Sequence, residues 1–329
     1  MGQRRFFVRK AAGVAACVLL ATACTGLQKD PDPTPINPTA VLEIQTASTG
    51  LLDIAAFENT TLAYTRPGMQ RTESRNGGTV ARLVDGETMV RIERLDRKLV
   101  WTLDAKNKQA VECPLRGCSR AGTKSAAPRN AGNDEKGAEP ACRLRVATTA
   151  ISVEPTGQKR KLDGFDTEQY DVRWIVTFRD NAQRKSTSTV SIDTWVAAAT
   201  PEWNNAATIE KTWDRARDKA LGGDTDSERQ GLLPAEVARM MSGYLATNVS
   251  PTDRANFLAG AKKLDKVKGV PILTIVKWSF SGEACSTDGT TKHTGDANLF
   301  TFTSEIKSHR VEARHDSLFA PPGDYKIKR

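Results

Sequence analysis

The chain has 329 residues, of which 39% are hydrophobic and 26% are charged. This composition excludes a collagen-like chain, a small disulfide-rich scaffold and a protein with many membrane-spanning helices. The formal net charge is +9, but lysines and arginines are scattered, and the densest basic run, residues 158–161, is typical of a solvated turn. We therefore expect no nucleic-acid interface, although a weak attraction to anionic lipid headgroups fits this charge.

The first 23 residues have the features of a signal peptide. Residues 1–10 are short and basic, and residues 11–23 form an apolar run that is too short to span a bilayer. Small residues then precede Cys24 in a run, Leu20-Ala21-Thr22-Ala23-Cys24, that resembles a lipobox. The sequence therefore predicts lipidation of Cys24. Secretory cleavage near Ala23 without lipidation is the alternative.

An export route is suggested by two adjacent arginines near the start. Arg4 and Arg5 are followed by a residue of any type, a phenylalanine, an aliphatic residue and a basic residue. This order resembles a twin-arginine signal, and the weakly hydrophobic, alanine-rich run behind it suits that pathway. A general basic start to a secretory leader is the alternative interpretation.

Residues 24–40 are expected to form a lipidated cysteine and an extended tether. The segment has four prolines and few apolar side chains, so it cannot build a packed core. Thr25 stands where an aspartate would argue for retention at the inner membrane. By that resemblance to lipoprotein sorting rules, we expect the protein on the periplasmic face of the outer membrane.

Residues 41–329 are expected to form a single domain in which strands come first, helices follow, and further strands come last. Alternation of apolar and polar side chains predicts half-buried antiparallel strands, at 60–65, 90–93, 99–103, 109–113, 142–153, 170–178, 187–197, 272–280 and 300–306. Residues 41–54 fit either a strand or a helix. Apolar stripes at helical spacing, more typical of core than of a cofactor site, predict helices around 209–220, 234–245 and 251–264.

Two segments interrupt this pattern. Residues 119–140 contain no aliphatic side chain larger than alanine, so we expect a disordered insertion. Residues 281–298 are rich in glycine and threonine, and we expect an irregular loop there.

Four cysteines remain in the body after Cys24 is lipidated: Cys113, Cys118, Cys142 and Cys285. In an oxidising compartment they predict two disulfides, with three possible pairings. We expect Cys142 to pair with Cys113 or Cys118 across the base of the insertion, and the remaining cysteine to pair with Cys285. The rival pairing joins Cys113 to Cys118 across a tight turn and leaves Cys142 with Cys285.

Residues for catalysis or metal binding are not indicated. The chain lacks a nucleophile-elbow motif, a phosphate-binding glycine loop, a zinc-protease motif and a C-x-x-C pair. Its three histidines, His293, His309 and His315, are expected at the surface, because metal sites need several convergent ligands. Residues 224–228 carry three acids but lack the glycine and bidentate acid of a calcium loop. We therefore expect no enzyme activity, no cofactor and no metal.

Several short phrases, taken in order, resemble uncharacterised exported bacterial lipoproteins related to the LolA/LolB/RseB half-barrel superfamily. The phrases are Leu99-Val100-Trp101-Thr102-Leu103-Asp104, Leu162-Asp163-Gly164-Phe165, Lys268-Gly269-Val270-Pro271-Ile272 and Ser317-Leu318-Phe319-Ala320-Pro321-Pro322-Gly323-Asp324-Tyr325. The resemblance implies an α+β fold in which helices cover the concave face of a strongly curved antiparallel β-sheet, a LolA-like half-barrel. No catalytic residue is known for this group, so none is carried over.

Two function classes follow from these expectations. The first is a membrane-anchored envelope lipoprotein that binds a hydrophobic ligand, a lipid or a lipoprotein acyl chain, in a half-barrel cavity. The second is a structural or sensor-like envelope protein with a filled interior, which acts through protein contacts. The membrane is the expected partner in both, through the N-terminal lipid; a protein partner is not identified by the sequence.

Overall fold

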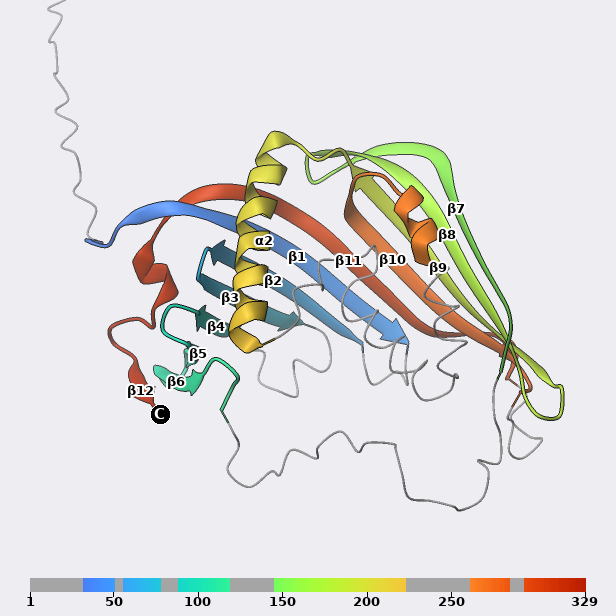
Figure 1. The fold of residues 1–329 in the computed structure, drawn as a ribbon, viewed down its shortest axis with the longest axis horizontal. Helices are drawn as coiled ribbons and strands as arrows, with labels where there is room; N and C mark the ends of the chain where they lie inside the picture. The colour runs from blue at the N-terminus through green and yellow to red at the C-terminus, as the bar shows by residue number, and fades with distance from the viewer. Residues whose placement is uncertain (1–31, 51–55, 78–87, 119–144, 223–260, 285–292) are drawn as a thin grey trace, which may run out of the picture. The chain divides into compact units, whose positions relative to one another are not determined.

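The computed structural model describes residues 32–50, 56–77, 88–118, 145–222, 261–284 and 293–329. Residues 34–329 form one compact unit, separate from residues 1–33. Within the described residues the fold is one 12-stranded sheet with the order β12-β6-β5-β4-β3-β2-β1-β11-β10-β9-β8-β7 (Figure 1). Neighbouring strands are antiparallel except for β12 and β6, which are parallel.

The first half of the sheet runs from β12 to β1. Its strands are β1 (Ile36–Gly50), β2 (Phe57–Arg66), β3 (Met69–Gly77), β4 (Thr88–Arg94), β5 (Leu99–Asp104), β6 (Gln109–Pro114) and β12 (Lys326–Lys328). The predicted strands at 60–65, 90–93, 99–103 and 109–113 are confirmed, and the segment that fitted either a strand or a helix begins with a strand. Because β1 begins at Ile36, the end of the predicted tether belongs to the sheet.

The second half contains five long strands. They are β7 (Arg145–Leu162), β8 (Phe165–Arg179), β9 (Lys185–Ala197), β10 (Val270–Gly282) and β11 (His293–His315). The predicted loop at 281–298 is wrong at both ends, because residues 281–282 belong to β10 and residues 293–298 belong to β11. The predicted insertion at 119–140 and the helix around 234–245 lie outside the described residues.

Two of the short sequence segments quoted above contain a glycine that the local backbone conformation requires. The turn from β7 to β8 consists of Asp163 and Gly164, which have φ values of 45° and 91°. A two-residue hairpin needs positive φ at both positions, and Asp-Gly is a preferred pair there. Gly269 precedes β10, and a Cβ atom on it would lie 2.6 Å from the carbonyl oxygen of Ala197. Only glycine fits this close approach of two backbones.

The helical content is one α-helix, α2 (Pro201–Leu221), and two 3-10 turns, η1 (Ala261–Lys266) and η2 (Asp316–Phe319), among the described residues. Thr200 caps the start of α2 by accepting a hydrogen bond from the backbone N–H of Trp203 (3.1 Å), and Gly222 ends it in the left-handed conformation. The predicted helix at 209–220 is confirmed. Of the predicted helix at 251–264, only the end is described, and it is part of η1.

The expected half-barrel is wrong. The sheet is open, with β12 and β7 as its edges, and it is not strongly curled. The fold is mainly β, and helices do not cover a concave face: α2 lies mainly against the middle of the sheet, at β1, β2 and β11 (Figure 1). The short phrases on which the resemblance rests describe local turns and strands, and these do not determine how far a sheet curls.

Two apolar clusters lie on opposite faces of this sheet. One covers the second half and is formed by side chains from β7 to β11, including Trp174, Phe178 and Phe302. The other covers the first half and includes Ile92 and Trp101. Successive side chains in a strand point to opposite faces, and the pairing register from β4 through β1 and β11 to β8 shows that the two sets face opposite ways.

Candidate functional site

The residues predicted to carry export and anchoring, Arg4, Arg5 and Cys24, lie outside the described residues. So do Cys142 and Cys285. Cys113, at the end of β6, is bonded to Cys118. This is the rival pairing, and the expected bond from Cys142 to either of these two cysteines is corrected. The turn at Leu115 and Arg116 folds the chain back, because the N–H of Gly117 donates to the carbonyl of Pro114 (2.8 Å).

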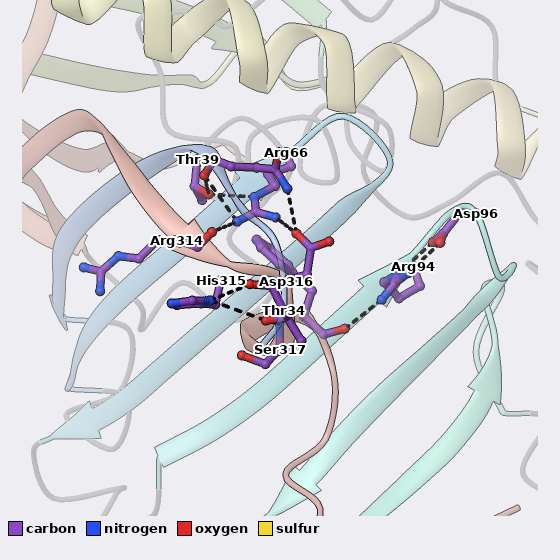
Figure 2. Close-up of polar contacts among 11 residues, drawn as sticks. Thr34, Thr39, Arg66, Arg94, Asp96, Arg314, His315, Asp316 and Ser317 are labelled. Atoms are coloured by element: carbon purple, nitrogen blue, oxygen red, sulfur yellow. Dashed lines mark hydrogen bonds and ion pairs between the residues drawn. The ribbon is translucent and has the colours of Figure 1, made fainter. Parts of the chain in front are cut away.

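A partly buried polar network joins the two ends of the described domain (Figure 2). At its centre is Arg66, at the end of β2, which is 4% exposed. Its Nε donates to the hydroxyl of Thr39 (2.7 Å), and its guanidinium also donates to the carboxylate of Asp316 and to the carbonyl of Arg314. The Asn37 side chain donates to the same Asp316 oxygen (3.0 Å). One arginine therefore holds the start of β1 against the end of β11.

Two further arginines extend this network along the C-terminal segment. Arg71 of β3 donates to the carbonyl of Leu318 (3.3 Å), and Arg94 of β4 donates to the carbonyl of Phe319 (3.2 Å). Arg94 is oriented by a second pair of hydrogen bonds, to the carboxylate of Asp96, which Figure 2 shows beside the turn after β4. Three neighbouring strands thus each contribute an arginine that binds a backbone carbonyl of residues 314–319. We call these three side chains the arginine clamp.

The arginine clamp lies beside a buried apolar side chain, Phe319, which we call the plug. Phe319 is fully buried against the cluster of Ile92 and Trp101, and Leu318 and Tyr325 pack beside it. The guanidinium of Arg66 lies 4.7 Å from the centroid of the Phe319 ring, a cation–π contact. The C-terminal segment therefore supplies the cover that the first half of the sheet needs on this face.

His315, Asp316 and Ser317 bind the segment that precedes β1. The Nδ1 atom of His315 lies 2.8 Å from the carbonyl oxygen of Thr34, and the N–H of Ser317 donates to the Thr34 hydroxyl (3.2 Å). The N–H of Asp316 donates to the carbonyl of Pro35 (3.0 Å). His315 is thus half-buried and bonded, which corrects the expectation of a free surface histidine.

A second polar cluster lies under α2 on the opposite face. His309 of β11 has a side chain that is 2% exposed, and its Nε2 lies 3.1 Å from the Glu210 carboxylate. The Trp203 ring packs edge-on against the imidazole at 4.2 Å between centroids, and Phe165 packs edge-on against Trp203. The expectation of a surface position for His309 is therefore wrong. His293 lies at the start of β11.

A charged pair ties α2 to β4 on the same face. Glu93, 6% exposed, accepts from Arg217 of α2 (2.8 Å) and from Arg91 (2.9 Å). Burial alone would raise the pKa of Glu93, but the hydrogen bonds from the two guanidiniums lower it below the ordinary value. On α2 itself, burial and the nearby carboxylates of Glu210 and Asp218 raise the pKa of Asp214.

The sequence reasoning missed the arginine clamp and the Glu93 pair. The clamp joins residues that are more than two hundred positions apart, such as Arg66 and Asp316, so no local spacing could reveal it. A usable signal existed in β4: Arg94 lies two positions after Ile92 and four after Val90, so it must face the same core as these two residues. That pattern indicates a buried partner without identifying it.

No group of three or more histidine, cysteine, aspartate or glutamate side chains among the described residues could hold a metal ion. Within the same residues, no helix is both long enough and apolar enough to cross a membrane. Comparison with known proteins finds no matching family model, no matching curated protein and no matching solved structure.

Proposed function

We propose that this protein is an exported, lipid-anchored protein of the bacterial cell envelope that acts by non-covalent contacts and not by catalysis. The signal-like leader and Cys24 support export and anchoring. A lipidated cysteine of this kind places the folded body at a membrane surface, and several acyl chains on one cysteine anchor it firmly.

The main observation in favour of a role in protein contacts is that large side chains fill the core on both faces of the sheet. Phe319 is completely buried over one face, and Trp174, Phe178 and Phe302 are each at most 2% exposed on the other. Side chains that fill the core in this way favour the structural or sensor-like class over a carrier with an acyl-chain cavity.

The partners of the buried charges support the same proposal. Arg66 is bound to Asp316, Glu93 to Arg217, and Asp180 to Arg184. Each pair neutralises a buried charge within the chain. The first two pairs join separate segments, and the third stabilises the turn between β8 and β9. We interpret these pairs as structural ties between segments of the chain.

A second candidate function is binding of a hydrophobic ligand, favoured by the apolar cluster on β7 to β11. This cluster contains Trp174, Trp278, Phe300 and Phe302 on one face of five adjacent strands. An acyl chain inserted against this face would contact aromatic rings over a wide area.

Native mass spectrometry on the Cys24→Ala chain discriminates between the two candidates. Removing the cysteine removes the covalent lipid, so any remaining lipid mass reports non-covalent binding. The contact role predicts the bare protein mass. A stoichiometric lipid adduct that survives mild detergent would favour the hydrophobic-ligand candidate and count against the filled interior.

Fractionation tests the anchoring part of the proposal. The wild-type chain is expected in the membrane fraction and the Cys24→Ala chain in the soluble envelope extract. Continued membrane association of the variant would mean that the body itself binds the membrane.

A further inference from the structure

Three cationic side chains stand in a row across the second half of the sheet. Arg145 of β7 is paired directly with Arg179 of β8, and Arg179 is paired directly with Lys185 of β9. Directly paired residues in antiparallel strands point to the same face, and neighbouring strands are about 4.8 Å apart. All three side chains are exposed. Like charges directly opposite each other in a sheet repel and are unfavourable.

No described carboxylate forms an ion pair with this row, although Glu283 lies next to Lys185 and its backbone N–H donates to the Lys185 carbonyl (2.9 Å). None of the three side chains forms an ion pair or a side-chain hydrogen bond within the described part of the chain. Asp180 is adjacent to Arg179, but its carboxylate is occupied. One oxygen accepts from the backbone N–H of Arg184 (2.9 Å) and the other from the Arg184 Nε (2.6 Å).

A cavity opens beside the row. It has a volume of about 480 Å³, and its polar lining comes from Arg145, Thr148, Arg179, Asp180, Asn181 and Gln183. Two guanidiniums, a hydroxyl and two carboxamides can all donate hydrogen bonds. Volumes of this size accommodate small organic molecules, so the cavity has room for more than a bare ion.

We infer that this cavity binds a phosphate group carried on a larger molecule. Guanidiniums form paired, charge-assisted hydrogen bonds with phosphate oxygens. A phosphate directs its oxygens to several sides, so it can accept from both arginines at once, whereas a carboxylate offers two oxygens in one plane. Binding would relieve the repulsion within the row. The phosphate can come from a soluble phosphate ester or from a phospholipid headgroup.

The test compares two variants of equal charge on the Cys24→Ala full-length chain. The site variant is Arg145→Gln with Arg179→Gln. The control is Arg173→Gln with Lys277→Gln, which removes two exposed cations from the same face but away from the cavity. Titration calorimetry with glycerol 3-phosphate probes the soluble source, and flotation with phosphatidylglycerol vesicles, against phosphatidylcholine vesicles, probes the headgroup. Circular dichroism of each variant establishes that it is folded.

The inference predicts that the site variant loses at least tenfold in affinity for one of the two probes while the control stays within about twofold of the parent chain. Loss of glycerol 3-phosphate binding identifies a soluble ester, and loss of phosphatidylglycerol binding alone identifies a headgroup. The inference is overturned if the parent chain binds neither probe, or if the site variant and the control lose binding equally, because the attraction is then due to net charge alone. This result does not depend on whether Cys24 is lipidated.

Discussion

Arg66 and Phe319 are in contact although they lie far apart in the sequence: the guanidinium of the first lies 4.7 Å from the ring centroid of the second, and both side chains are buried. The contact places a charge against the apolar plug that covers Ile92 and Trp101. Because Arg66 also binds Asp316 and the carbonyl of Arg314, it couples the plug to the end of β11. The stability of the first half of the sheet therefore depends on this arginine.

We expect Arg66→Ala to lower the free energy of unfolding by about 3 kcal/mol. Removing one partner of a buried pair leaves polar groups without hydrogen bonds, at a cost of about 3–5 kcal/mol, and the partial exposure of Asp316 reduces that cost. Chemical denaturation measures the change. Arg75→Ala is the matched control, because Arg75 is an exposed arginine on β3, and a change within about 0.5 kcal/mol is expected there. Equal effects of the two variants would contradict the role of the clamp.

Phe319→Ala removes the plug while leaving the arginines in place. Truncating a fully buried phenylalanine costs about 3–5 kcal/mol, and Phe319 is 0% exposed. Hydrogen exchange should become faster in β4, β5 and β6, which the plug covers, and remain unchanged in β8 and β9. Ile327→Ala, at a residue that is 45% exposed, is expected to change neither quantity. Uniform acceleration across the whole sheet would contradict a local role for the plug.

Glu93→Gln tests the charged pair between β4 and α2 through its pH dependence. The pKa of Glu93 is lowered in the folded protein, so its stabilising contribution is present above the unfolded value of about 4.3 and is lost as the pH falls through the folded value. We expect the wild type to be about 2 kcal/mol more stable than the variant at pH 7. The difference should shrink as the pH falls below about 4.

The control for that experiment is Glu168→Gln, because Glu168 is paired with Lys159 at an exposed position. Its effect on the free energy of unfolding is expected to be small at every pH. A difference between wild type and Glu93→Gln that stays constant from pH 3 to pH 7 would mean that the carboxylate charge is not what matters.

Non-reducing peptide mapping should identify a peptide that links Cys113 to Cys118. Replacing both with serine is expected to lower the free energy of unfolding by about 2 kcal/mol in the chain-entropy model, because the closed loop is short. A peptide that links Cys142 to either cysteine would instead support the pairing expected from the sequence. The reduced wild type serves as the comparison for the double variant.

Local patterns were sufficient to predict most strands. In β8, the large side chains of Tyr170, Val172, Trp174, Val176 and Phe178 alternate with Asp171, Arg173, Ile175 and Thr177, and every residue from Val172 to Phe178 on the first of these faces is buried. The end of α2 at Gly222 was predicted as well, since glycine is typical of that position. Its start at Pro201 was missed, because the apolar stripe begins only at Ile209. These features depend on near neighbours only.

The failures have physical causes that near neighbours cannot show. His309 lies on the same face as Phe302, although the odd spacing between them predicts opposite faces. The reason is a register shift in the pairing of β1 with β11, between Glu43 and Ile44, which leaves Lys307 as an extra residue in β11. One inserted residue reverses every later side chain. Openness of the sheet is likewise a property of all its strands together.

The mass of the N-terminal peptide of the protein isolated from membranes tests the central claim most directly. The account predicts a peptide that begins at Cys24 and carries the added mass of a diacylglyceryl group, and its absence from the Cys24→Ala chain. A mature protein that begins at any other residue, or at Cys24 without added lipid, would contradict the account.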